Sequence, residues 1–221
     1  RIRHLNLLLG DQLDRGSPLL ESFDCTHDRI LMAEVMEEST HVWRSRIRIA
    51  LFLAAMRHHR DWLEDEEYPV MYFALDDSRG HTSFGKVLEA LAKKHSVERL
   101  RVVRPGDYRV WEGLESTCQT IGWEFEMLED PHFFTTPAEF ASHASGRKQL
   151  RMEYFYRELR KREDILMDQG KPIGGQWNYD SQNRQSFGKQ GPQSIPSRKR
   201  FPPDSMTTGV IRLVDSRFSD H

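Results

Sequence analysis

The chain has 221 residues and a mass of 26.0 kDa, with 38% hydrophobic residues, 30% charged residues and a mean hydropathy of −0.69. No apolar run approaches the roughly 20 residues of a membrane span, which excludes a membrane protein. The first ten residues lack the pattern of a secretion signal. Cys25 and Cys118 are too few for a disulfide framework, a typical iron–sulfur cluster or a Cys-rich zinc site. We therefore expect a cytoplasmic protein with no metal site in this chain.

Charge is distributed unevenly along the chain, although the net charge is only −2. Residues 1–146 carry 17 Lys and Arg against 25 Asp and Glu, whereas residues 147–200 carry 13 against 6. A basic segment of this kind marks a nucleic-acid contact or forms a solvated face whose charges pair with one another. Both interpretations stay open at this stage.

Residues 1–130 alternate short apolar runs with amphipathic stretches, which is typical of βα units. The apolar runs predict five strands, at 5–9, 29–35, 70–75, 100–103 and 124–128. Helical periodicity predicts helices at 41–64, 83–94, 108–121 and 137–143. The predicted fold class is α/β, with a doubly wound, mostly parallel, five-stranded sheet.

Residues 131–221 have a different texture and are expected to form a helical, loop-rich extension. A basic helix with a narrow apolar stripe is predicted over 147–162, and a final amphipathic helix over 207–218. Between them, Gly, Pro, Asn, Gln and Ser dominate residues 170–203, with no strand or helix pattern. A loop of this length is usually functional or disordered.

A ligand crevice is expected at the carboxyl ends of the strands, where an open α/β sheet binds its ligands. Gly10 lets a ligand approach the backbone, while Asp11 and Glu38 offer hydrogen-bond acceptors. The candidate binding residues follow the first, second and fourth strands: Gly10, Asp11, Gln12, Val35, Met36, Glu38, Pro105 and Gly106. The simpler alternatives are that Asp11 caps a turn and that Glu34, Glu37 and Glu38 form a solvated helix entry.

Several kinds of chemistry have no motif in the sequence. The two strongest phosphate-binding fingerprints are missing, which disfavours a dinucleotide or a nucleoside triphosphate. No Ser–His–Asp set, Cys–His pair or HExxH motif is present, so no residue is assigned a catalytic role. His58 and His59 are adjacent on a predicted helix and point in different directions, so one is expected to be buried and the other exposed.

The basic segment offers a second candidate site, for nucleic acid. Its cations suit phosphates and its aromatic rings suit stacking on bases. The candidate residues are Arg147, Lys148, Arg151, Arg157, Arg160, Trp177 and Arg184. The alternative is that Trp177 anchors the loop by packing while the cations pair with neighbouring acidic residues.

Six strings in order along the chain resemble the photolyase-related proteins, specifically the iron–sulfur bacterial cryptochromes and prokaryotic (6-4) photolyases. They are LLGDQL at 8–13, EVMEE at 34–38, IALFLAAMRH at 49–58, PGDYRV at 105–110, the segment from GRK at 146–148 to YRE at 156–158, and GGQWNYD at 174–180. The chain departs from some relatives at Ala33, where they have cysteine, and at His41, where they have an aromatic residue.

The resemblance implies a Rossmann-like N-terminal domain that binds an antenna chromophore, 6,7-dimethyl-8-ribityllumazine, at Gly10, Asp11, Val35, Met36 and Glu38. It also implies a helical C-terminal domain, beyond residue 221, that holds FAD and a 4Fe–4S cluster. In such a complete protein, excited antenna passes energy to reduced FAD, which gives an electron to a (6-4) lesion flipped out of DNA. This chain alone is expected to be inactive in repair and monomeric.

Two other classes of function remain as alternatives. One is a non-enzymatic nucleic-acid-binding module that uses residues 147–200. The other is a small-molecule enzyme that acts on a nucleotide at the crevice of Asp11 and Glu38, although no catalytic base with a defined partner is visible there.

Overall fold

The computed structural model describes residues 1–77, 82–180, 186–189, 191–192 and 194–221. Within it the chain folds into two units. The first unit joins Arg1–Asp130 to Pro202–His221, and the second is Pro131–Phe201. The first unit is therefore built from two separate stretches of sequence.

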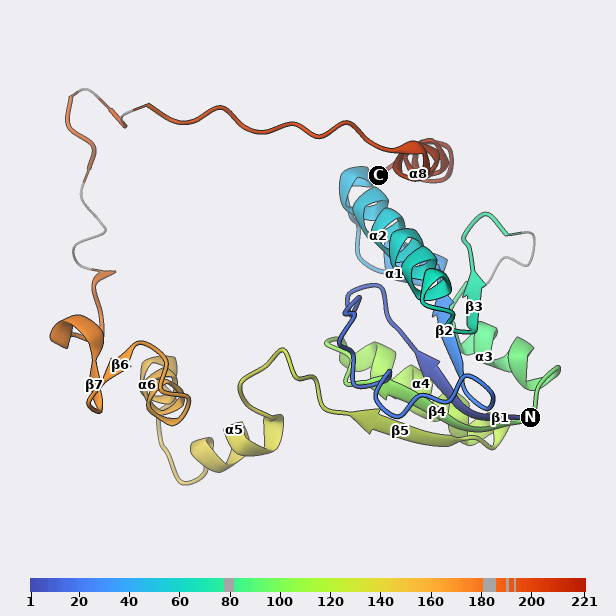
Figure 1. Ribbon diagram of the computed structural model, residues 1–221, viewed down its shortest axis with the longest axis horizontal. Helices are drawn as coiled ribbons and strands as arrows, with labels where there is room; N and C mark the ends of the chain where they lie inside the picture. The colour runs from blue at the N-terminus through green and yellow to red at the C-terminus, as the bar shows by residue number, and fades with distance from the viewer. Residues whose placement is uncertain (78–81, 181–185, 190, 193) are drawn as a thin grey trace. The chain divides into compact units, whose positions relative to one another are not determined.

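The first unit contains a five-stranded sheet in which every pair of neighbouring strands is parallel (Figure 1). Its strands are β1 (Ile2–Leu7), β2 (Arg29–Ala33), β3 (Val70–Phe73), β4 (Val97–Val103) and β5 (Glu124–Leu128), in the order β3-β2-β1-β4-β5. The predicted number of strands and the parallel arrangement are confirmed. The strand order reverses between β1 and β4, so the switch point of the sheet lies there.

Helices cover both faces of this sheet, so the doubly wound prediction is also confirmed. Helix α2 (Arg46–Asp65) packs on one face, and α3 (Phe84–Ala92) and α4 (Tyr108–Ile121) pack on the other. Alternate strand residues serve the two faces, because Leu7 packs toward α3 and α4 whereas Leu8 packs in the cluster with Met56 of α2. A short helix, α1 (Met36–Thr40), follows β2 and was not predicted.

Only some of the apolar residues of helix α2 are buried. Ile47 and Leu51 contribute to the helical periodicity of the sequence, yet their exposed fractions are 85% and 65%. The buried residues lie on other faces of the helix and include His59, whereas the side chain of His58 is half exposed. The expectation of one buried and one exposed histidine is confirmed.

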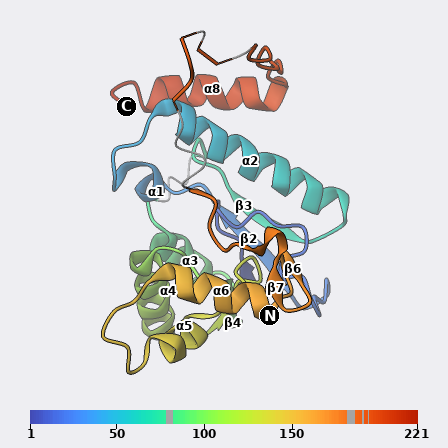
Figure 2. The same cartoon turned by 90° about the vertical axis from the view of Figure 1, so that its left-hand side faces the viewer.

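The last helix, α8 (Ser205–Arg217), packs along α2 on the side away from the sheet, as both views show (Figure 2). Val210, Val214 and Phe218 are spaced by four residues and are almost fully buried, which places them on one face. This helix was expected in the extension of residues 131–221, whereas it packs in the first unit. Contacts between residues about 160 positions apart leave no local sequence pattern.

The described residues of the second unit include two helices, α5 and α6, and a small hairpin. Helix α5 (Pro137–Ala144) begins with a capping box in which Thr136 and Glu139 exchange hydrogen bonds. Helix α6 (Met152–Arg162) is followed by strands β6 (Met167–Asp168) and β7 (Lys171–Pro172) and a 3₁₀ turn, η1 (Ile173–Gly175). Strand β7 and the 3₁₀ turn correct the expectation that residues 170–203 contain no strand or helix.

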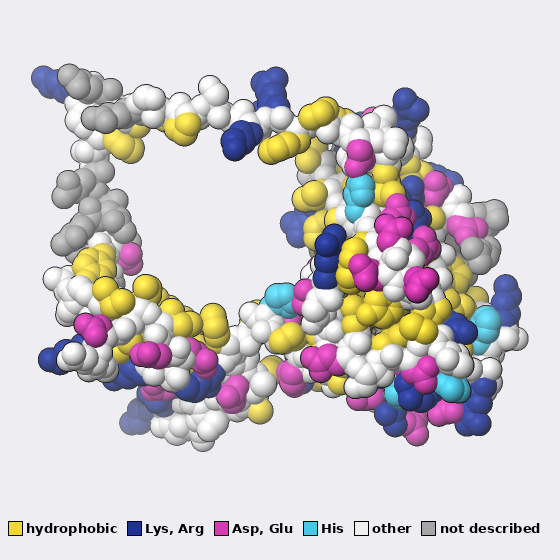
Figure 3. Space-filling view, in the orientation of Figure 1, with side chains coloured by type: hydrophobic (Ala, Val, Ile, Leu, Met, Phe, Trp, Pro, Cys, Tyr) yellow, Lys and Arg dark blue, Asp and Glu magenta, His cyan; other side chains and the backbone are white. Residues whose placement is uncertain are grey.

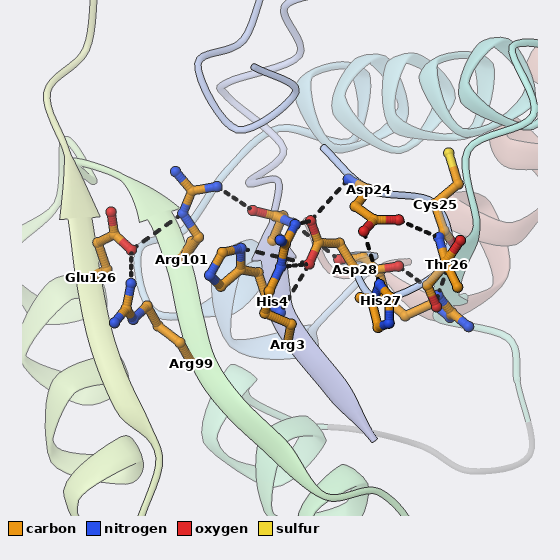
Figure 4. A network of polar contacts seen from close by, with 12 residues as sticks. Arg3, His4, Asp24, Cys25, Thr26, His27, Asp28, Arg99, Arg101 and Glu126 are labelled. Carbon is orange, nitrogen blue, oxygen red and sulfur yellow. Dashed lines mark hydrogen bonds and ion pairs between the residues drawn. The ribbon is translucent and has the colours of Figure 1, made fainter. Parts of the chain in front are cut away.

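A network of polar contacts ties the strand starts together at the edge opposite the predicted crevice (Figure 4). The carboxylate of Asp28, just before β2, is fully buried and accepts two hydrogen bonds from the Arg3 guanidinium, at 2.9 and 2.5 Å. The backbone N–H groups of His4 and Asp24 donate to the same carboxylate. Burial raises the pKa of Asp28, but these hydrogen bonds outweigh burial and hold its pKa below the usual range.

This network predicts a specific loss of stability in acid. A carboxylate with a lower pKa in the folded chain stabilises the fold above its unfolded pKa of about 3.9, and this contribution disappears as pH falls through the folded pKa. Urea unfolding should therefore show a steeper loss of unfolding free energy between about pH 5 and pH 2 for wild type than for Asp28→Asn. Parallel profiles for the two proteins would contradict the assignment.

Candidate functional site

A cavity of about 200 Å³ opens in the first unit at the carboxyl ends of β1, β2 and β4. This is the switch point of the sheet, where open α/β folds bind their ligands. The lining residues come from the strand ends, from α1, α2 and the loop between them, from the first turns of α3 and α4, and from the loop before α4. They are Leu9, Gly10, Asp11, Ala33, Glu34, Val35, Glu38, Ser39, Arg44, Arg48, Ile49, Phe52, Leu53, Met56, Phe84, Pro105, Gly106, Asp107 and Val110.

Six of the eight candidate binding residues line this one cavity: Gly10, Asp11, Val35, Glu38, Pro105 and Gly106. The other two have structural contacts elsewhere. The amide of Gln12 donates to the carbonyls of Val103 and Arg104, at 3.3 and 2.9 Å, and so ties the segment after β1 to the end of β4. Met36 packs against the cluster between α2 and α8.

The absence of a side chain at Gly10 serves the packing of Met56. A Cβ at this position would lie 2.8 Å from the Met56 Sδ, which is closer than real contacts allow. Met56 is buried and itself lines the cavity. Gly10 was expected to let a ligand approach the backbone closely. Its missing side chain also leaves room for the side chain of Met56.

Glu34 forms the most buried polar group in the cavity wall, with no exposed side-chain surface. Arg57 of α2 donates to both of its carboxylate oxygens, at 2.7 and 2.8 Å, in a bidentate ion pair. The Tyr72 hydroxyl donates at 2.5 Å and the backbone N–H of Leu75 donates at 2.8 Å. Burial and the Glu34 carboxylate raise the pKa of Tyr72, so its hydroxyl keeps the proton that it donates.

A second ion-pair cluster borders the cavity around Arg109 of α4. Its guanidinium donates to Glu37 at 2.8 Å, to Glu38 at 2.7 Å and to Asp107 at 3.4 Å. Asp107 also accepts from the backbone N–H of Arg109, and this hydrogen bond lowers the pKa of Asp107. Three carboxylates thus lie beside one cation. The interpretation of Glu37 and Glu38 as merely solvated is replaced by a defined pairing across α1 and α4.

The cavity also contains residues that the sequence analysis did not select. Arg44, Arg48 and Phe52 line it from α2 and the loop before it, and Phe84 lines it from the start of α3. Arg44, Arg48 and Phe84 belong to no motif, and Phe52 lies in the string at 49–58 but was not selected as a binding residue. They can be identified only by their position on or next to the helices that flank the strand ends. This position is known only from the folded structure.

The glycine contact predicts that Gly10→Ala lowers the free energy of unfolding by less than about 1 kcal/mol, because the added methyl group displaces only the flexible end of the Met56 side chain. Gly113→Ala is the matched control, since a Cβ there meets no atom within 4 Å and alanine favours the helix. Urea unfolding of both variants decides the point. Equal stability of Gly10→Ala and wild type would show that the contact is unimportant.

The buried ion pair predicts that Glu34→Gln lowers the free energy of unfolding by about 2 kcal/mol, because it removes the buried partner of Arg57 and leaves the guanidinium paired only with the half-exposed Asp76, at 2.9 Å. Glu37→Gln should cost less than about 1 kcal/mol, since the Glu37 side chain is 40% exposed and its pairing is screened by water. Thermal and urea unfolding measure both. A similar small loss in the two variants would be inconsistent with a dominant role for Glu34.

The candidate nucleic-acid residues of the second unit are partly engaged in its own packing. Arg157 and Arg160 lie 5.3 and 5.2 Å from the Trp177 ring centroid, and Lys161 lies at 5.6 Å. Arg157 also pairs with Glu153, and the buried Arg160 donates to the carbonyls of Ile165 and Leu166 after α6. Trp177 therefore packs on α6 through cation–π contacts, as the packing alternative described.

The remaining basic residues are divided between pairing and exposure. Arg147 pairs with Glu158 at 3.1 Å, whereas Lys148 and Arg151 are exposed. Arg184 lies outside the described residues. In Figure 3, Lys and Arg side chains gather along one side of this unit and hydrophobic side chains along another.

Two features are absent from the part of the chain that the structure describes. None of its helices combines the length and apolar character that crossing a bilayer requires. Within the same residues, no three His, Cys, Asp or Glu side chains gather closely enough to hold a metal ion.

The fold defines a Rossmann-like α/β protein, with a cavity at the switch point of its sheet. Comparison with known proteins identifies its relatives. Residues 6–221 match the family described as deoxyribodipyrimidine photo-lyase-related protein, and the chain belongs to this family. The resemblance drawn from the six strings is confirmed.

Two curated relatives illustrate the range of this similarity. The chain is 35% identical over 218 residues to a (6-4) photolyase of Agrobacterium fabrum, a match that covers 98% of the chain and 42% of the photolyase. It is 30% identical over 145 residues to an uncharacterized protein of Acanthamoeba polyphaga mimivirus, which covers 64% of the chain and 71% of that protein. The chain thus spans less than half the length of the photolyase that it matches.

Proposed function

We propose that the first unit is the antenna-chromophore-binding domain of a photolyase-related protein. One observation carries the proposal. Gly10, Asp11, Val35 and Glu38, at which the family resemblance expects the antenna, line a single cavity at the switch point of the sheet. Membership of the photolyase-related family makes a light-absorbing ligand the chemical class to test first.

The cavity lining suits a planar heteroaromatic ligand with a polar tail. Ile49, Phe52 and Leu53 offer an apolar wall from α2, and the carboxylates of Asp11 and Glu38 accept hydrogen bonds from ring N–H or hydroxyl groups. The volume of about 200 Å³ lies below the range of about 300–1,000 Å³ for closed ligand pockets. We therefore expect the ring to enter the cavity and the tail to extend toward solvent. The proposed ligand is 6,7-dimethyl-8-ribityllumazine, which supplies light absorption when bound.

The activity of a longer protein forms a further part of the proposal. FAD, a 4Fe–4S cluster and electron transfer to a DNA lesion are expected in a C-terminal domain, in the manner that the family resemblance implies. In that setting the first unit would collect light, and no residue of 1–221 is assigned to the chemical step. Cytoplasmic location and a monomeric state remain expectations.

The observed contacts favour this function over a stand-alone nucleic-acid module. Arg157, Arg160 and Trp177, which were central to that alternative, hold one another and the turn after α6 in place. Lys148 and Arg151 are exposed and remain candidates for a phosphate contact in a longer protein.

The test is fluorescence titration of the purified chain with 6,7-dimethyl-8-ribityllumazine, with FMN and FAD measured in parallel. We expect saturable binding of the lumazine and about tenfold weaker binding by Glu38→Gln, because a hydrogen bond to a charged group is lost. Glu37→Gln is the matched control, since both residues pair with Arg109 but only Glu38 lines the cavity. The proposal fails if none of the three compounds binds, and Glu38 leaves the site if both variants lose the same affinity.

A further inference from the structure

Helix α8 packs against the same α2 residues that line the cavity. Ile49 and Leu53 belong to the cavity lining and also to the hydrophobic cluster that contains Val210, Val214 and Phe218. The two α2 residues are four positions apart and are only 3% and 5% exposed. One stretch of α2 therefore lies between the cavity and α8, and α8 does not itself line the cavity.

Polar contacts attach the C-terminal segment to α2 and to the loop before it. Asp215 accepts from the Arg46 guanidinium at 3.1 Å, and Asp204 lies 3.0 Å from the Nε2 of His58. The Nδ1 of His221 donates to the backbone carbonyl of Arg44 at 3.0 Å, and Arg44 lines the cavity. These contacts are spread from the loop before α2 to the second half of the helix.

The cluster also reaches the residue that completes the Glu34 network. Leu75 is 9% exposed and packs in the cluster with Val210 and Val214, while its backbone N–H donates to the Glu34 carboxylate at 2.8 Å. The cluster that contains α8 thus includes α2, which lines the cavity, and Leu75, which holds the cavity residue Glu34 in place. Packed interiors have few voids that could absorb a displacement of α8.

We propose that residues 205–221 position the α2 wall of the cavity, so that docking of α8 and binding of a ligand in the cavity stabilise each other. The physical reason is that the ligand binds best to the geometry of the α2 wall that docked α8 maintains. Because docking of α8 and ligand binding favour the same conformation, each increases the stability of the other to the same extent. The claim about the wall stands on the packing alone. The claim about the ligand rests on the proposed function.

The variant that tests this inference is Val214→Ala, which removes two buried methyl groups from the α8 face. Two controls separate positioning from general stability. Ile211→Ala alters the half-exposed side of the same helix, and Val97→Ala removes the same atoms from a buried site at the start of β4, the opposite end of the sheet from the cavity. A merely stabilising role of α8 would make Val214→Ala and Val97→Ala behave alike.

The first measurement needs no ligand. Hydrogen exchange of the amides of residues 46–53 should be faster in Val214→Ala than in wild type and in both controls. The same exchange rates in Val214→Ala and Val97→Ala would overturn the inference, whether or not the chain binds a chromophore.

The second measurement uses 6,7-dimethyl-8-ribityllumazine as the probe. We expect Val214→Ala to bind it at least about fivefold more weakly than wild type, with unchanged affinity in Ile211→Ala and Val97→Ala. Saturating lumazine should in turn slow amide exchange in residues 205–217 of wild type. Unchanged affinity of Val214→Ala would refute the coupling, whereas no binding by wild type would refute the proposed function and leave the decision on the wall to the exchange data.

Discussion

The cavity depends on one buried charge, the carboxylate of Glu34 at the end of β2. An ionised carboxylate without partners costs several kcal/mol in a protein interior, so this residue is tolerated only because all of its neighbours donate to it. Arg57 brings α2 to the strand end, while Tyr72 and Leu75 bring β3 and the segment after it. The geometry that satisfies Glu34 is therefore the geometry that places α2 beside the strand ends, and the space between them is the cavity.

The two carboxylate clusters of the site have different physical roles. Glu34 is closed off from water and binds α2 to the sheet, whereas Glu38 is partly exposed and shares Arg109 with Glu37 and Asp107. Burial lowers the pKa of Arg109, but its three carboxylate neighbours outweigh burial and raise it, so the guanidinium stays charged. A ligand in the cavity that forms a hydrogen bond with Glu38 shares this carboxylate with Arg109 or displaces Arg109 from it. Glu34, in contrast, keeps its hydrogen bonds to the protein.

The sequence allowed the sheet to be predicted because its signal is local. Apolar runs bounded by loops located all five strands, and α4 begins and ends at the predicted residues. The candidate binding residues came from the same reasoning, since parallel strands bring their carboxyl ends to one edge. Glu34 was read as one acid among three, because no sequence pattern names Arg57 and Tyr72 as its partners. Helix α8 was assigned to the extension because its packing on α2 is a long-range contact. The helical periodicity of its sequence shows that it has an apolar face but does not show which element that face packs against.

That long-range contact changes how the middle of the chain is understood. Residues 131–201 form an insertion of 71 residues between the two stretches of sequence that make up the first unit. Closing a flexible loop of this length costs about 4 kcal/mol of entropy, and the second unit's own folded structure lowers this cost. Burying Val210, Val214 and Phe218 contributes roughly 5–9 kcal/mol, which offsets this cost and part of the entropy of ordering the helix. The apolar face of α8 therefore helps to hold the C-terminal helix on α2, where it can influence the cavity that lies on the other side of that helix.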